Sequence, residues 1–126
     1  MEKIYSFEKL KIWQIAHQHM LQCYKFANEH LPPDEKYNRI IQLKRCASSV
    51  PANIAEGFGR YHYLENIQFC RIARGSLDEL KNHLIAARDL LQAPKDDCDK
   101  LIKNCDNIKL ALNCYIRELN RLYKQK

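Results

Sequence analysis

The segment CASSVPANIAEG, residues 46–57, is made mostly of small residues in a region otherwise rich in helix-forming residues. A second small-residue segment, ARGSLDEL, follows at residues 73–80. Packed helices lie about 8–10 Å apart, at a distance set by the side chains between them, so we expect these segments to face each other across a close helix crossing. Gly75 costs about 1 kcal/mol relative to Ala in a helix interior, which favours a packing or functional reason for this residue.

The composition predicts one all-α domain that covers residues 1–126. Hydrophobic residues make up 46% of the 126-residue chain and charged residues 29%, which is ordinary for a globular protein. Only three glycines and four prolines are present. Strands would need a turn about every 8–12 residues, so a chain with so few turn-forming residues must consist of long helices.

Apolar residues recur every three or four positions through most of the chain, which predicts four helices. The expected helices cover approximately residues 4–31, 34–58, 63–91 and 96–122. Ser6 can cap the first helix, and Pro32 and Pro33 separate it from the second. Long helices with short connections predict an antiparallel up-down-up-down four-helix bundle.

Pro51 lies inside the second predicted helix. A proline removes one backbone hydrogen bond and clashes with the preceding turn, at a cost of about 3 kcal/mol, so we expect the helix to kink at Pro51. The alternative is two helices broken at Ser49. We prefer one kinked helix because the apolar spacing passes through Pro51 without a change of phase.

Several polar residues lie close to the small-residue segments. They are Gln42, Arg45, Asn53, Glu56 and Arg74. In a functional interpretation these residues line a pocket. In a structural interpretation they form a polar network that aligns the second and third helices. We prefer the structural interpretation, with Glu56 paired to Arg45 or Arg74, because breaking a buried pair typically costs about 3–5 kcal/mol.

The sequence contains no recognisable catalytic or metal-binding motif. The six cysteines include no CxxC pair, and none of the five histidines belongs to an HExxH or ExxH motif. We therefore predict a non-catalytic protein without metal or cofactor. No apolar run approaches the roughly 20 residues of a membrane span, and we expect reduced, buried cysteines in a cytoplasmic protein.

The net charge of +6 and the pI near 9.0 would attract a polyanion such as RNA or DNA, although many basic proteins bind neither. The last predicted helix begins with aspartates and ends with basic residues, Lys126 among them. This gradient indicates either a phosphate-binding patch or simple complementation of the helix dipole. The expected nucleic-acid contacts are Arg60, Lys109, Arg117, Arg121 and Lys124, with Tyr61, Tyr63 or Tyr123 available to stack on bases.

Three runs carry a family resemblance: FEKLKIWQIAH at residues 7–17, QLKRCASSVPANIAEGFGR at residues 42–60 and FCRIARGSLDEL at residues 69–80. They resemble the four-helix-bundle family named after proteins encoded in intervening sequences of bacterial 23S ribosomal RNA genes. The resemblance implies a bundle that assembles into a ring, commonly a homopentamer, without established enzymatic activity. The accessory variability determinant of diversity-generating retroelements is similar in architecture, and it binds nucleic acid and a reverse transcriptase.

Together, charge and resemblance predict a non-catalytic homo-oligomer, by resemblance a pentamer, that binds nucleic acid or acts as a scaffold. A reverse transcriptase of a diversity-generating retroelement is the protein partner that the resemblance implies. The alternative is a purely structural protein-protein interaction ring that binds no nucleic acid. An enzyme would need a pocket with displaced pKa values near Glu56 and Arg74, which makes it the weakest of the three hypotheses.

Overall fold

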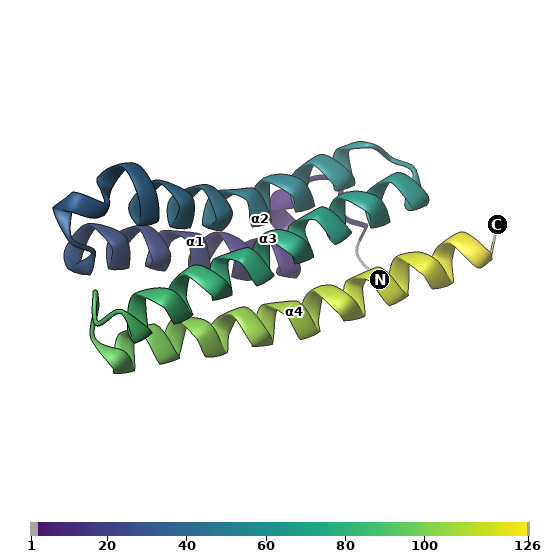
Figure 1. Cartoon of the computed structure of the whole chain (residues 1–126). Helices are drawn as coiled ribbons and strands as arrows, with labels where there is room; N and C mark the ends of the chain where they lie inside the picture. Colours follow the sequence, from purple (N-terminus) through teal and green to yellow (C-terminus); the bar gives the residue numbers. More distant parts are fainter. Residues whose placement is uncertain (1–2, 126) are drawn as a thin grey trace.

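The computed structural model describes residues 3–125, and over this range it contains four α-helices and no strand. The α-helices are α1 (Lys11–His30), α2 (Ile41–Gly59), α3 (Tyr63–Asp89) and α4 (Lys95–Lys124). Short helical segments η1 (Phe7–Lys9), η2 (Pro33–Glu35) and η3 (Lys36–Ile40) precede α1 and α2. In Figure 1, α1 and α3 run toward the left and α2 and α4 toward the right. No described helix is long and apolar enough to cross a membrane.

Each α-helix packs against two others, so that α1 contacts α2 and α4, and α3 contacts the same two helices. The centre is filled by completely or almost completely buried aliphatic side chains. They include Leu43, Ile54, Leu77, Leu84 and Leu112. Full burial of such a side chain contributes roughly 1.5–3 kcal/mol. This interior explains the apolar periodicity of three and four from which the helices were predicted.

The first helix begins later than predicted. Leu10 is extended, with φ −73° and ψ 124°, so α1 begins at Lys11 and not near residue 4. Ser6 caps only the short η1 turn, where its Oγ accepts the Glu8 N–H at 3.4 Å. Phe7 packs edge-on against Trp13, with ring centroids 5.0 Å apart. The chain therefore bends at Leu10, whose side chain is buried in the core.

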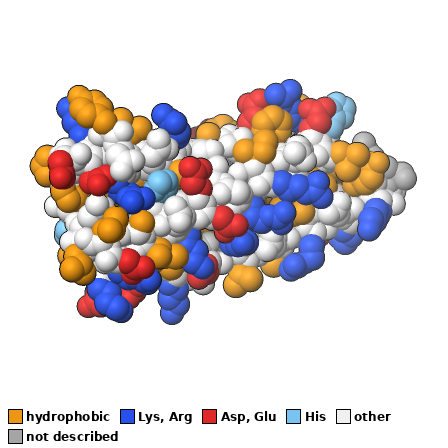
Figure 2. Space-filling view, in the orientation of Figure 1, with side chains coloured by type: hydrophobic (Ala, Val, Ile, Leu, Met, Phe, Trp, Pro, Cys, Tyr) orange, Lys and Arg blue, Asp and Glu red, His pale blue; other side chains and the backbone are white. Residues whose placement is uncertain are grey.

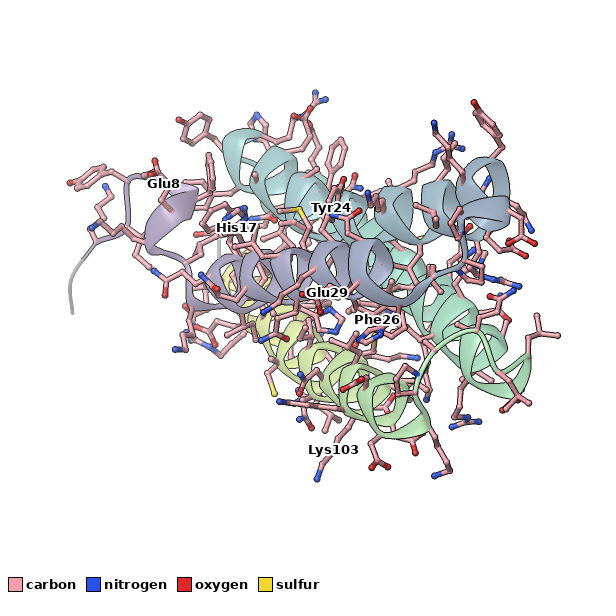
Figure 3. All side chains as sticks on the ribbon, turned by 90° about the vertical axis from the view of Figure 1, so that its left-hand side faces the viewer. Glu8, His17, Tyr24, Phe26, Glu29 and Lys103 are labelled. Carbon is pink, nitrogen blue, oxygen red and sulfur yellow. The ribbon has the colours of Figure 1, made fainter. Side chains whose placement is uncertain are left out.

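The contact between α1 and α2 includes two hydrogen bonds between side chains, one of them from Lys44 Nζ to Asn28 Oδ1 at 2.7 Å. The Tyr24 hydroxyl lies 2.7 Å from Ser48 Oγ. Figure 3 shows Tyr24 on the side of α1 nearest α2, while Lys103 on α4 points away from the bundle. The Ser48 hydroxyl thus joins α2 to α1 from within the small-residue segment.

The second helix also differs from the prediction at its start. A 3-10 turn at η2 and a π-turn at η3 come first, and α2 begins only at Ile41. The Glu35 carboxylate accepts the Arg39 backbone N–H at 3.1 Å and an Asn38 N–H at 3.0 Å, which holds this wider turn. From Ile41, α2 continues through the buried Pro51, so the alternative of a break at Ser49 is wrong. A kink at Pro51 stays a prediction.

The close helix crossing depends on Gly57, and the expectation that placed Gly75 there is wrong. A Cβ atom added to Gly57 would lie 2.7 Å from Asn66 Oδ1 and 2.9 Å from Phe69 Cβ, so only glycine fits at this point between α2 and α3. A Cβ atom added to Gly75 would meet no atom within 4 Å. Ser76 does serve the crossing, because its Oγ lies 2.8 Å from Ser49 Oγ.

The cysteines follow the prediction with one exception. Cys23, Cys46, Cys70, Cys98 and Cys105 are free and buried, whereas Cys114 is free and exposed. Burial raises the pKa of the Cys70 thiol to about 12, and burial with the nearby Asp106 charge does the same for Cys105. Such thiols are protonated at neutral pH and act as small apolar side chains.

Candidate nucleic-acid interface

Polar side chains of α3 and α4 meet along the length of the two helices, in a contact that we call the α3–α4 seam. Its cross-helix contacts include Arg88–Asp99 at 2.8 Å, Lys81–Asp106 at 2.8 Å, Asp78–Lys109 at 3.0 Å and Arg74–Asn113 at 2.8 Å. Along the seam the residue number of the α4 partner rises while that of the α3 partner falls, because the two helices run in opposite directions. The seam therefore extends from the α3–α4 connection toward the end of α4.

Half of the seam is electrically neutral. In this paired half, nearest the α3–α4 connection, every cross-helix contact joins a cation to a carboxylate. Lys95 and Arg88 both donate to Asp99 and hold the pKa of that carboxyl below its ordinary value. The hydrogen bond to Asp106 likewise raises the pKa of Lys81. The cations of this half already have anionic partners.

In the other half of the seam, the cations are not paired with described carboxylates. Arg74 donates to the neutral side-chain amide of Asn113. One turn before Arg74 on α3 is Arg71, and one turn after Asn113 on α4 is Arg117, so both lie next along the seam. Both are exposed, and no carboxylate of the described residues lies within 4.0 Å of either guanidinium. We call Arg71, Arg74 and Arg117 the cation half of the seam.

The surface view agrees with this division. Figure 2 shows Lys and Arg side chains gathered over the lower right of the molecule, toward the end of α4, while acidic side chains accompany basic ones at the upper right. Toward the left, basic and acidic side chains are mixed. The basic character predicted from net charge is therefore concentrated on one part of the visible face.

Three of the five predicted nucleic-acid contacts have acidic partners, and Arg60 and Lys109 are two of them. Arg60 Nη2 lies 2.8 Å from Glu56 Oε1, Arg60 Nη1 lies 3.9 Å from Glu65, and the guanidinium rests 5.0 Å from the Phe69 ring centroid. Lys109 donates to Asp78 across the seam. Either cation would have to leave an existing partner before it could bind a phosphate fully.

The remaining three predicted contacts lie near the end of α4. Arg121 forms an ion pair with Glu118 through two hydrogen bonds. Arg117 donates to Cys114 Sγ at 3.1 Å, and Lys124 is exposed. Neither cation forms an ion pair with any described residue. Lys126 lies outside the described residues. Arg117 and Lys124 are thus the predicted cations that are most available to a phosphate.

Sequence reasoning missed Arg71 and assigned Arg74 to the structural network. Their spacing of three residues on one helix was a visible signal, because it places both side chains on one side of α3. The signal becomes meaningful only when α4 places Arg117 beside them. The cation half also differs from the paired half because its α4 partner, Asn113, is neutral, whereas the partners in the paired half are charged.

The predicted polar network takes another form. Glu56 pairs with Arg60, one turn later in the same helix, and not with Arg45 or Arg74. Asn53 Nδ2 instead donates to Ser49 O at 2.8 Å and to Ser49 Oγ at 2.9 Å, which continues the Ser49–Ser76 contact. These hydrogen bonds are neutral and lie inside the α2–α3 crossing. No hydrogen bond among the described residues joins Gln42 or Arg45 to them.

Within residues 3–125, one cluster of potential metal ligands is present, formed by Cys46 on α2 with Glu79 and His83 on α3. Their ligand atoms lie within 4.8 Å of one another. However, Arg39 Nη1 donates to His83 Nδ1 at 2.7 Å, and a neutral imidazole has only one nitrogen lone pair to offer. Burial and Glu79 also raise the Cys46 pKa to about 12. The existing hydrogen bond, the protonated thiol and the Arg39 charge all oppose a divalent cation.

The comparisons with known proteins identify the family. The family model for the 23S rRNA-intervening sequence protein matches residues 8–114, and the chain belongs to this family. The match confirms the resemblance in the sequence, and the family's name does not denote an enzyme. No curated protein matches the chain. The matched range includes Arg71 and Arg74 but ends before Arg117, Arg121 and Lys124.

Proposed function

We propose that this member of the 23S rRNA-intervening sequence protein family is a non-catalytic, homo-oligomeric module that binds nucleic acid through the cation half of the α3–α4 seam. The observation that carries the proposal is that no carboxylate of residues 3–125 pairs with Arg71 or Arg117, whereas carboxylates pair with the cations along the paired half. Exposed arginines that are not neutralised by a carboxylate are suited to phosphates, which they bind with two parallel hydrogen bonds.

The chemistry of this surface favours binding over catalysis. A guanidinium stays protonated at physiological pH, so Arg71, Arg74 and Arg117 can neutralise phosphates but cannot act as general bases. The cations are spread over two helices, which suits a long polyanion. The overall charge of +6 adds an attraction that does not depend on nucleotide sequence.

Self-association is supported by two exposed apolar side chains and one exposed glycine on α3. Leu64 and Ile72 are 53% and 45% exposed, and Gly75 has open space where a side chain would be. A helix of a second copy could approach Gly75 closely and cover Ile72, which would offset the cost of glycine within a helix. Copies arranged in a ring would sum the fields of their cation halves. The pentamer stays a prediction.

The alternative is a purely structural ring. It is favoured by the internal ion pairs of Arg60, Lys109 and Arg121, which leave fewer free cations than the sequence predicts. Such a ring would show no salt-dependent RNA binding and would retain a protein partner in pull-down experiments. The reverse transcriptase partner, the retroelement role and the cytoplasmic location also stay predictions.

The test compares two double variants with the same change in formal charge. Arg71→Gln with Arg117→Gln alters the cation half, and Lys81→Gln with Lys109→Gln alters the paired half. RNA affinity is measured by fluorescence anisotropy over a salt series, with a structured RNA as the probe. Loss of two phosphate contacts should reduce the slope of log K against log salt by about 1.4–1.8 in the first variant, with a much smaller change in the second.

Equal changes in the two variants would mean that only net charge matters, and the proposed interface would be wrong. Circular dichroism checks that both variants fold. Size exclusion with light scattering tests self-association, for which we expect a mass several times the 15.0 kDa of one chain. An oligomer that binds no RNA at low salt would favour the structural ring, and a monomer would contradict both proposals.

A further inference from the structure

A cavity of about 540 Å³ lies at the end of the bundle where α2 ends and α3 begins. Four parts of the chain surround it: the segment before η1, the end of α2 with the following loop, the start of α3, and α4. Half of its lining residues are phenylalanine or tyrosine, and the residues that matter here are Tyr5, Phe58, Tyr61, Tyr63, Asn66 and Tyr115. We call this cavity the end pocket.

The rim of the end pocket presents two aromatic side chains to solvent. Tyr5 is 79% exposed and Tyr61 is 84% exposed, whereas Phe58 and Tyr115 are partly buried. A planar ring entering the pocket could therefore stack on a tyrosine at the rim while contacting apolar surface below. Aromatic side chains bind bases in this way with little dependence on sequence, because every base has a π-face.

The backbone holds Tyr61 in a conformation that tyrosine rarely adopts. Its φ angle is 61°, in the left-handed region that favours glycine. Tyr61 directly follows the C-cap Arg60, so this left-handed residue ends α2 in the way that Leu91, with φ 59°, ends α3. The turn leaves the Tyr61 side chain largely exposed.

Polar groups are fixed inside the pocket. Asn66 is only 7% exposed, and its Nδ2 donates to the Tyr115 hydroxyl at 3.3 Å. Its Oδ1 accepts from the Cys70 thiol at 3.6 Å, which sets the orientation of the amide. Because the Tyr115 oxygen accepts from Asn66, its own proton can be donated to a ligand, and burial raises the Tyr115 pKa so that this proton is retained.

A cation lies beside the aromatic rim. Lys3 also lines the pocket, and its Nζ lies 5.4 Å from the centroid of the Tyr5 ring. No described carboxylate lies within 4.0 Å of this ammonium group. A stacked base would thus have a positive charge nearby for its phosphate, which an aromatic amino acid side chain would not use.

We propose that the end pocket binds one unpaired nucleobase of a single-stranded nucleic acid, stacked on Tyr61 and Tyr5 and hydrogen-bonded at its edge by the Tyr115 hydroxyl. The inference rests on the proposed nucleic-acid function and narrows its ligand to strands with unpaired bases. Bases within a duplex are stacked on each other and cannot enter such a pocket. Single strands, loops and bulges offer bases that can be turned outward.

The test uses a short single-stranded RNA with one fluorescent aminopurine base, and the same RNA annealed to its complement. We expect the wild-type protein to bind the single strand more tightly and to quench its fluorescence by stacking. Tyr61→Gly should weaken single-strand binding about tenfold and remove the quenching. The same change should leave thermal stability equal or higher, because glycine accepts the left-handed backbone without strain.

A matched tyrosine at the other end of the molecule provides the control. Tyr37 in η3 is 82% exposed and has Lys36 Nζ 5.5 Å from its ring, much as Tyr5 has Lys3, but it does not line the end pocket. Tyr5→Ala should weaken single-strand binding and Tyr37→Ala should not. Equal effects of these two changes, or a Tyr61→Gly variant that keeps both affinity and quenching, would overturn the pocket.

The failure of the pocket can be distinguished from the failure of the proposed function. If Arg71→Gln with Arg117→Gln weakens RNA binding while Tyr61→Gly and Tyr5→Ala do not, the pocket inference is wrong and the cation half stands. If the wild-type protein binds neither single-stranded nor duplex RNA at low salt, the proposed function is wrong and the pocket proposal falls with it.

Discussion

Helix α3 makes two long contacts of opposite character, one with α2 and the other with α4. At the contact with α2, Gly57 of α2 lies so close to α3 that no side chain would fit, and Ser49 and Ser76 form a neutral hydrogen bond. Against α4, helix α3 places long charged side chains such as Lys81, which meets Asp106 at the surface. The small-residue segments that dominate the sequence therefore serve packing, and the candidate binding surface lies on the other contact.

The physical reason for the difference is the space that each contact leaves. The α2–α3 crossing brings backbones and Cβ atoms into van der Waals contact, so the addition of one carbon displaces its neighbours. The α3–α4 seam is partly exposed, and its long side chains can move without disturbing the backbone. We therefore expect mutations at the crossing to change stability and mutations along the seam to change binding.

The largest effect is expected at Gly57. A Cβ atom in Gly57→Ala would meet Asn66 Oδ1 at 2.7 Å and Phe69 Cβ at 2.9 Å, so the helices must separate. Overpacking of this kind typically lowers the free energy of unfolding by about 1–3 kcal/mol. Gly75→Ala is the control, and it should raise the stability of the single chain by up to about 1 kcal/mol because nothing lies within 4 Å.

Chemical denaturation measures both glycine variants. Similar stabilities for Gly57→Ala and Gly75→Ala would show that the crossing is looser than the structure indicates. Light scattering sharpens the comparison, because Gly75→Ala should weaken self-association if a second copy approaches α3 at this residue.

A smaller effect is expected from the serine hydrogen bond at the crossing. A double-mutant cycle of Ser49→Ala and Ser76→Ala should give a coupling free energy of about 1 kcal/mol that does not change with salt. The matching cycle on the seam, Lys81→Ala with Asp106→Ala, should give a smaller coupling that disappears at high salt, since both side chains are substantially exposed. A seam coupling larger than that of the serines would reverse the comparison.

The smallest expected effect is a pH dependence of stability that arises from His83, on the side of α3 that faces α2. Burial and the neighbouring Arg39 charge lower the pKa of His83 below 6.5, although Glu79 acts in the opposite direction. The unfolded chain therefore binds a proton more readily than the folded chain. The stability contributed by neutral His83 is complete above about pH 6.5 and is lost as the pH falls toward the folded pKa.

Thermal unfolding followed as a function of pH checks this expectation. The midpoint should fall on acidification, and His83→Gln should reduce the fall. Part should remain, because burial also lowers the pKa of His19, whose Nε2 lies 3.1 Å from Leu101 O. An unchanged pH dependence in His83→Gln would contradict the role given to the Arg39–His83 contact.

Much of the fold could be predicted from the sequence, because helical periodicity is a local property. The ranges of α3 and α4 lie close to those predicted, and α2 passes through Pro51 as expected. The starts of α1 and α2 could not be predicted in the same way. They depend on specific local contacts, Phe7 against Trp13 before α1 and Glu35 with Arg39 before α2, which apolar periodicity does not reveal.

The candidate site was only partly predictable. The free cations Arg117 and Lys124 follow from composition and helical spacing. The pairing of Lys109 with Asp78, and the place of Arg71 and Arg74 beside Arg117, depend on how α3 and α4 are aligned. Glu56 illustrates the same limit, because its partner Arg60 lies on its own helix and not across the crossing.

The sequence by itself determined the four helices, their apolar faces and the excess of positive charge. These properties depend on residue type and on spacing within one helix. Only the tertiary structure decided which glycine lies in the tight crossing, which cations are neutralised and which aromatic side chains surround the end pocket. Each of these depends on the register between helices, which results from the packing of the whole core and cannot be read from the spacing along any single helix.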